Sequence, residues 1–91
     1  MSKILTQHPQ GKKGVNIDIQ KYEIIKEFII KNLEENGEMT YEKLNELAIV
    51  ELKGKFEGSI PWYFVTVKLD LEARNIIERI PKTSPHKIKI I

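Results

Sequence analysis

Side chains able to do acid–base, nucleophilic or metal chemistry are few in this sequence and widely scattered. The two histidines, His8 and His86, lie near opposite ends of the chain, and there is no cysteine. Because zinc sites draw on cysteine and histidine at short, regular spacings, no metal site is expected. Ser59 and Ser84 have no base at a motif spacing, so nucleophilic catalysis is not expected either. The sequence therefore predicts a protein without catalytic residues or cofactors, which is not an enzyme.

Carboxylates that are close in sequence do not form a catalytic pair here. Glu34-Glu35 is one such set, and Asp70 with Glu72 is another. Residues one or two positions apart on a helix point in different directions, so their side chains do not face each other. We expect all of these carboxylates to lie on solvated faces.

The segment Gly11-Lys12-Lys13-Gly14 has the composition of a phosphate-binding loop but not its layout. A nucleotide-binding loop needs a longer glycine-rich stretch, followed by Lys-Ser or Lys-Thr, between a strand and a helix. Two interpretations of the lysine pair stay open. It is either a solvated pair in a turn, which the usual exposure of lysine favours, or part of a basic arm that contacts DNA phosphate.

Composition indicates a single soluble domain, and the positive and negative charges are distributed unevenly along the chain. Of its 91 residues, 41% are hydrophobic and 31% charged, which suits one hydrophobic core. No apolar run has the length of a signal peptide or a membrane span, so we expect a cytoplasmic protein without membrane contact. Residues 1–16 carry three lysines and no acid, residues 17–52 nine acids against four lysines, and residues 53–91 eight basic residues against four acids. Positive ends around a negative middle suit a face turned toward a polyanion.

Capping residues and apolar periodicity predict three helices. Asp18, Thr40 and Ser59 have side-chain oxygens placed to accept hydrogen bonds from the free amides of a first helical turn. Apolar residues then recur at three- and four-residue spacing along the first two helices. Asn36-Gly37 is expected to end the first helix, and Asn75 to end the third at about residue 74, because both tolerate a left-handed backbone.

Extended segments complete the predicted fold. A short stub is expected at 37–39, and the two segments 76–80 and 87–90 are rich in β-branched residues or alternate at period two. Prolines mark a turn between these two segments. The prediction is an α+β winged helix-turn-helix, with three helices followed by a two-stranded β-hairpin wing. Residues 1–16 lack helical period and are expected to form an N-terminal arm before the domain at 17–91.

Two resemblances support this fold. Leu71–Arg79 resembles the end of the recognition helix in multiple-antibiotic-resistance-type winged-helix regulators, with Asn75 in place of the usual glycine. Gly11–Asp18, Trp62-Tyr63 and Thr66–Arg74 resemble an uncharacterised family of short bacterial winged-helix-like proteins, a domain of unknown function. The second resemblance spans about residues 11–91. It implies a winged-helix fold and no particular activity.

The third helix is apolar on two nearly opposite sides. One face has Ile60, Phe64, Val67 and Leu71, and the other, here called the Trp62 face, has Trp62, Val65, Leu69 and Ala73. A helix that is apolar on two sides is normally covered on both. Base-reading faces need polar side chains, and here only Thr66 and the flanking Lys68 provide them. The N-terminal arm, a second copy of the chain or a partner protein are the three covers that stay open.

Two functions follow as hypotheses. The leading one is a DNA-binding, transcription-regulator-like module, and the alternative is a protein-interaction or dimerisation module that uses the Trp62 face. Candidate contacts to duplex DNA are Lys12, Lys13, Lys53, Lys55, Thr66, Lys68, Arg79, Lys82, His86, Lys87 and Lys89. Candidate contacts to a protein partner or a homodimer are Trp62, Val65, Leu69 and Ala73.

Overall fold

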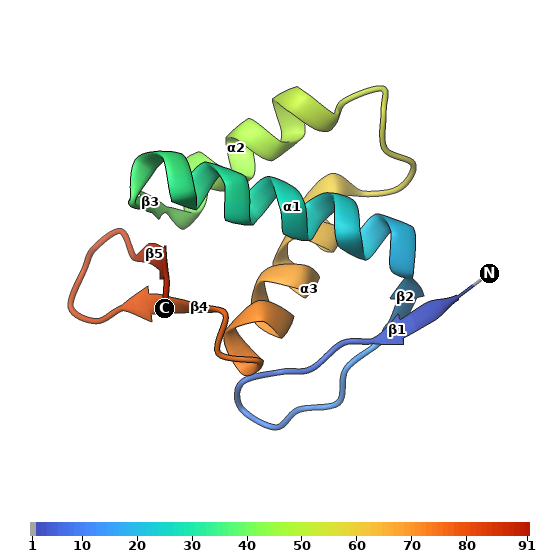
Figure 1. The fold of residues 1–91 in the computed structure, drawn as a ribbon, viewed down its shortest axis with the longest axis horizontal. Helices are drawn as coiled ribbons and strands as arrows, with labels where there is room; N and C mark the ends of the chain where they lie inside the picture. The colour runs from blue at the N-terminus through green and yellow to red at the C-terminus, as the bar shows by residue number, and fades with distance from the viewer. Residues whose placement is uncertain (1) are drawn as a thin grey trace.

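The computed structural model describes residues 2–91, which form three helices and two small antiparallel sheets (Figure 1). The α+β class predicted from the sequence is confirmed. In chain order the elements are β1 (Lys3–Leu5), β2 (Asn16–Asp18), α1 (Ile19–Asn36), β3 (Glu38–Thr40), α2 (Tyr41–Leu52), α3 (Ile60–Ala73), β4 (Ile77–Ile80) and β5 (Lys87–Ile90).

The helices begin at the predicted caps. Oδ1 of Asp18 accepts a hydrogen bond from the amide of Gln20 at 2.7 Å, at the start of α1. Thr40 and Ser59 cap the first turns of α2 and α3 in the same way, at 3.2 and 3.3 Å. Each cap gives a partner to an amide that the helix itself leaves free.

The helix ends also lie close to the predicted positions. Gly37 follows α1 with a φ of 81°, and its amide donates to the carbonyl of Leu33. Asn75 follows α3 with a φ of 61°. Both residues stop a helix because they adopt the left-handed backbone at low steric cost.

The three strands that follow α1 and α3 form one sheet in the order β3-β5-β4. Ile88 of β5 lies opposite Met39 of β3 on one side and opposite Arg79 of β4 on the other. Ile88 and Ile77 are buried, so the sheet closes one end of the core. The predicted stub and both predicted C-terminal strands are therefore confirmed to within a residue.

β1 is a strand that the sequence did not predict. It pairs antiparallel with β2, with Ile4 opposite Ile17, and β2 begins at Asn16. The boundary expected after residue 16 therefore lies inside a β-hairpin. Three-residue strands are too short to show a period, and β1 meets its partner only across a long loop, so local pattern does not reveal the pair.

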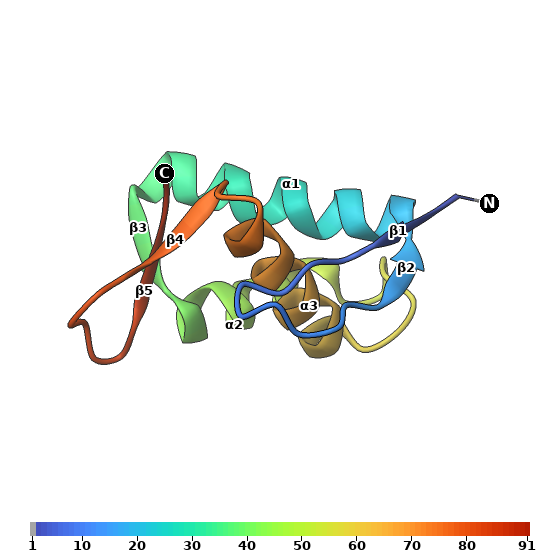
Figure 2. The same cartoon turned by 90° about the horizontal axis from the view of Figure 1, so that it is seen from below.

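The core lies between α1, α3 and the sheet, with α2 against α3. The predicted stripe of α1 is buried, and the predicted stripe of α2 and one face of α3 are buried in part, with Leu47, Leu52 and Ile60 half-buried against the core. Figure 2 shows the loop between β1 and β2 passing across α3. The buried helical residues are Tyr22, Ile25, Phe28, Ile29, Leu33, Leu44, Ala48, Phe64, Val67 and Leu71.

Candidate functional site

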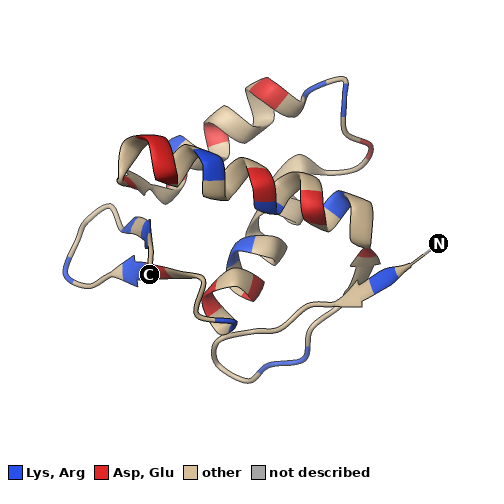
Figure 3. Cartoon of the chain, in the orientation of Figure 1, with Lys and Arg blue, Asp and Glu red and all other residues tan. Residues whose placement is uncertain are grey.

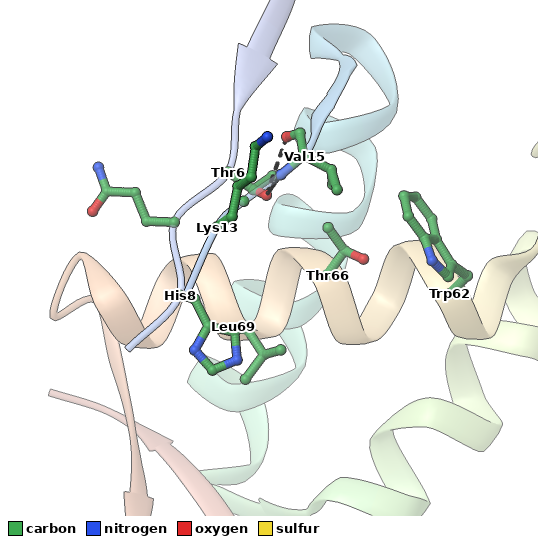
Figure 4. A pocket seen from close by; sticks show the side chains of 9 residues that line it. Thr6, His8, Lys13, Val15, Trp62, Thr66 and Leu69 are labelled. Atoms are coloured by element: carbon green, nitrogen blue, oxygen red, sulfur yellow. Dashed lines mark hydrogen bonds between the residues drawn. The ribbon is translucent and has the colours of Figure 1, made fainter. Parts of the chain in front are cut away.

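A groove lies between the N-terminal arm and α3. Residues 6–8 and 13–15 line it from the arm, and Trp62, Thr66 and Leu69 line it from α3 (Figure 4). Its volume is about 160 Å³. We call it the arm groove. It brings together Lys13 of the predicted arm and three residues of α3 that the sequence proposed for DNA or protein contact.

The arm side of the groove is held by paired backbone segments. The amide of Thr6 donates to the carbonyl of Val15 at 2.9 Å, and the amide of Val15 donates to Oγ1 of Thr6 at 3.0 Å. A Cβ on Gly14 would lie 1.7 Å from the carbonyl oxygen of Thr6. Only glycine permits this approach, so Gly14 lets the two sides of the hairpin close on each other.

Asp70 ties the arm to the helical core. Its carboxylate accepts from the amide of Gln7 at 2.8 Å, from the hydroxyl of Tyr22 at 2.5 Å, and from Nε of Arg74 at 2.9 Å. These donors come from the arm, from α1 and from the residue that follows α3. Asp70 is 0% exposed, so the prediction that it lies on a solvated face is wrong. The sequence analysis missed this role because two of the three donors, Gln7 and Tyr22, reach Asp70 only after folding.

This cluster shifts the ionisation of its members. Burial raises the pKa of Tyr22 well above its usual value, and its hydrogen bond to Asp70 raises it further. The hydrogen bond to Asp70 also raises the pKa of Arg74. Both groups therefore stay protonated and keep donating to a carboxylate, which satisfies a buried charge.

The Trp62 face is only partly covered by the arm. Val65, Leu69 and Ala73 are half-buried, whereas Trp62 is 45% exposed. Its ring meets the ring of Tyr63 edge to face at 4.9 Å. Val15, which is 40% exposed, points from the arm toward Trp62 in Figure 4. The arm is thus one cover of this face, and an apolar part stays in contact with solvent.

Two residues proposed for phosphate contact have other partners. Lys68 is buried, its Nζ lies 2.5 Å from Oε1 of Glu72, and it stands 5.4 Å from the ring centre of Tyr41. His86 packs against the same Tyr41 ring, and its Nε2 is buried without a partner among residues 2–91. The expectation that Lys68 and His86 face a phosphate, and that Glu72 is simply solvated, is therefore corrected. Only the folded chain brings α2, α3 and the β4–β5 hairpin together here.

The remaining predicted basic contacts are spread over three segments. The arm, the β4–β5 hairpin and the loop from α2 to α3 all carry cations, whereas acids recur along α1 and α2 (Figure 3). In Figure 1 that loop lies at the upper edge of the molecule and the tip of the arm at the lower edge. On β5, Lys87 lies 3.2 Å from Glu38, and Lys89 lies 4.0 Å from Glu78. The exposed set is Lys12, Lys13, Lys53, Lys55, Arg79, Lys82 and Lys89.

Among residues 2–91 no group of three or more His, Cys, Asp or Glu side chains is arranged to hold a metal ion. Within the same part of the chain, no helix is both long and apolar enough to cross a membrane.

The fold and the site define the class of protein. It is an α+β domain of three helices and two small sheets, with a groove between its N-terminal arm and α3. Residues 3–88 match the family of unknown function DUF6958, and the chain belongs to that family. The predicted membership in a family without an assigned function is confirmed. No curated protein and no solved structure matches the chain.

Proposed function

We propose that the chain is a non-catalytic winged-helix module that binds another protein through the arm groove. The order helix, strand, helix, helix, hairpin and the sheet order β3-β5-β4 support the winged-helix assignment. In it, α2 and α3 form the helix-turn-helix, and the β4–β5 hairpin is the wing. The resemblance of Leu71–Arg79 to multiple-antibiotic-resistance-type regulators supports the same assignment.

One observation carries the preference for protein over DNA: the arm lies on α3. In helix-turn-helix proteins the recognition helix lies in the major groove and presents side chains to base edges. Here the arm crosses α3, with the amide of Gln7 bonded to Asp70 and with Thr66 in the floor of the arm groove. The exposed side chains beside it include two apolar ones, Trp62 and Val15. Aromatic, apolar centres are typical of protein interfaces.

The connection between α2 and α3 is also longer than the turn of DNA-binding helix-turn-helix proteins. It runs over residues 53–59, whereas the turn of a helix-turn-helix usually has only about 3–4 residues. A longer connection loosens the fixed spacing that places a recognition helix against phosphate contacts of the preceding helix. This supports the use of the fold for a contact other than base reading.

Site-specific photocrosslinking in the cells that make the protein tests the proposal. A photoreactive residue replaces Val15 in one variant and Val50 in the control, because Val50 is 73% exposed on α2, outside the arm groove. We expect protein adducts from position 15 that are absent from position 50. Adducts to nucleic acid, or equal adducts from both positions, would contradict the proposal.

A second candidate function is phosphate contact with duplex DNA through the wing and the arm. It is favoured by Lys12, Lys13 and Lys82, which are exposed and have no ion pair among residues 2–91. Each phosphate contact releases counterions, so the affinity falls with salt in proportion to the number of contacts.

Titration of duplex DNA at several salt concentrations measures this second function. Lys82→Ala is expected to lower the slope of log affinity against log salt by about 1, whereas Lys68→Ala leaves it unchanged because Lys68 is buried and forms an ion pair with Glu72. Undetectable binding at low salt removes this candidate and leaves the protein contact standing.

A further inference from the structure

We propose that the arm groove receives one large apolar side chain from an acidic segment of a partner protein. This rests on the proposed function, that the arm groove binds a protein, and adds the chemistry of what binds. The argument uses the size of the groove, its charge and the rigidity of its walls.

The size of the arm groove suits a single side chain. Its volume of about 160 Å³ lies below the ~300 Å³ at which pockets for small-molecule ligands begin. A nucleotide or similar cofactor would be too large for it. Trp62, Val15 and Leu69 give it apolar walls, so an aromatic or large aliphatic side chain fits its chemistry. Anchors of this kind supply most of the binding energy in protein interfaces.

The charge around the arm groove favours an acidic partner. Lys13 lines it, Lys12 adjoins Lys13, and no Asp or Glu of residues 2–91 is among its lining residues. Neither lysine has an ion pair in that part of the chain. Asp70 lies behind the arm, but it is fully buried and bonded to three donors. A carboxylate beside the apolar anchor therefore meets unpaired cations at the rim.

The same charge disfavours a second copy of this chain as the occupant. In a symmetric dimer whose two-fold axis passes through the arm groove, Lys12 and Lys13 of one copy would approach those of the other. The acidic helix α1 of a second copy has the right charge, but a contact in which one copy's arm groove meets α1 of the next is head-to-tail and builds rings or open chains of molecules. A separate acidic segment meets neither difficulty.

The walls of the arm groove are formed before anything binds. Paired bonds between Thr6 and Val15 hold the arm side, and the bond from Gln7 to Asp70 holds the arm against α3. The edge-to-face contact with Tyr63 supports the ring of Trp62. A preformed site loses less conformational entropy on binding, so a short segment suffices as the partner.

Selection from a displayed library of random twelve-residue segments tests the inference on the full chain. Selected segments are synthesised and titrated while the emission of Trp62, the single tryptophan, is recorded. We expect them to carry net negative charge and one Phe, Leu or Trp. Replacing that anchor by Ala should weaken binding at least about tenfold.

Matched variants locate the contact. Val15→Ser is expected to weaken binding several-fold and Val50→Ser to leave it unchanged, because both valines are exposed but only Val15 lines the arm groove. Lys13→Glu should shift a repeated selection from acidic to basic segments, whereas Lys43→Glu, an exposed lysine on α2, should not.

The outcomes separate this inference from the proposed function. If the selected segments bind through the arm groove but carry no net negative charge, the inference of an acidic partner is wrong and the proposed protein contact still holds. Segments that bind Val15→Ser as well as wild type, or none above background, overturn both. If the protein forms concentration-dependent dimers that bury Trp62, and if Val15→Ser dissociates them, then a second copy is the occupant. The inference is then wrong.

Discussion

The hydroxyl of Tyr22 on α1 lies 2.5 Å from Oδ2 of Asp70 on α3, and both residues are buried. The second oxygen of the same carboxylate accepts from the amide of Gln7 in the arm. One buried side chain therefore joins α1, α3 and the arm, and the position of the arm over α3 depends on it.

Removal of the Tyr22 hydroxyl should destabilise the fold measurably. Tyr22→Phe leaves a buried carboxylate with one donor fewer, so we expect the free energy of unfolding to fall by about 1–3 kcal/mol. Urea unfolding followed by circular dichroism measures it. Tyr63→Phe is the control, because no hydrogen bond of the Tyr63 hydroxyl is found among residues 2–91, and its effect should stay within about 0.5 kcal/mol. Equal losses in the two variants would remove the special role of the bond to Asp70.

A side chain at position 14 should open the arm. Gly14→Ala places a Cβ on the carbonyl of Thr6, so the arm hairpin has to separate. We expect the amides of Thr6 and Gln7 to exchange with solvent at least about tenfold faster, as measured by hydrogen exchange. Gly11→Asn is the control, because Gly11 has open space and a φ of 74°, which Asn tolerates. Unchanged protection at both amides in Gly14→Ala would show that the arm does not close as described.

Stability should depend on pH through His86. Burial lowers the pKa of His86 below its usual 6.5, and the positive charges of Arg79 and Lys68 lower it further. The unfolded chain then binds the proton more readily than the folded chain, so stability is lost as the pH falls below about 6.5. Urea midpoints between pH 7.5 and 5 should therefore fall more steeply for wild type than for His86→Gln. Parallel curves would contradict a lowered pKa of His86 in the folded chain.

The C-terminal end of α3 should depend on the left-handed backbone conformation of Asn75. Its φ is 61°, where an alanine side chain costs about 1 kcal/mol more than asparagine or glycine. Asn75→Ala should therefore lower the free energy of unfolding by about that amount, and Asn75→Gly should change it by less than about 0.5 kcal/mol. Thermal melting of the three proteins compares them directly, and a neutral Asn75→Ala would show that the turn does not need this conformation.

Prediction from the sequence succeeds where neighbours along the chain decide the structure. Asp18, Thr40 and Ser59 act on amides two or three residues away, and the left-handed stop at Asn75 is a property of one residue. The buried stripes of α1 and α2 follow from helical geometry in the same way. Family membership also rests on the order of residues alone.

Only part of the candidate site could be predicted from the sequence. The two apolar sides of α3 are a matter of spacing, and they raised the question of what covers Trp62. The answer depends on the arm, whose hairpin has no readable pattern. The interior position of Asp70 was missed because a charged residue between two apolar faces is usually solvated unless folding provides its donors.

The amino-acid sequence by itself therefore determined the helices, their limits, the C-terminal strands and the unusual composition of α3. Tertiary structure alone decided that Asp70 is buried, that Lys68 is buried beside the ring of Tyr41, and that the arm forms a groove with Trp62. The physical reason is the separation of the partners. Gln7 and Asp70 are 63 positions apart, so their hydrogen bond exists only when the whole core has brought them together.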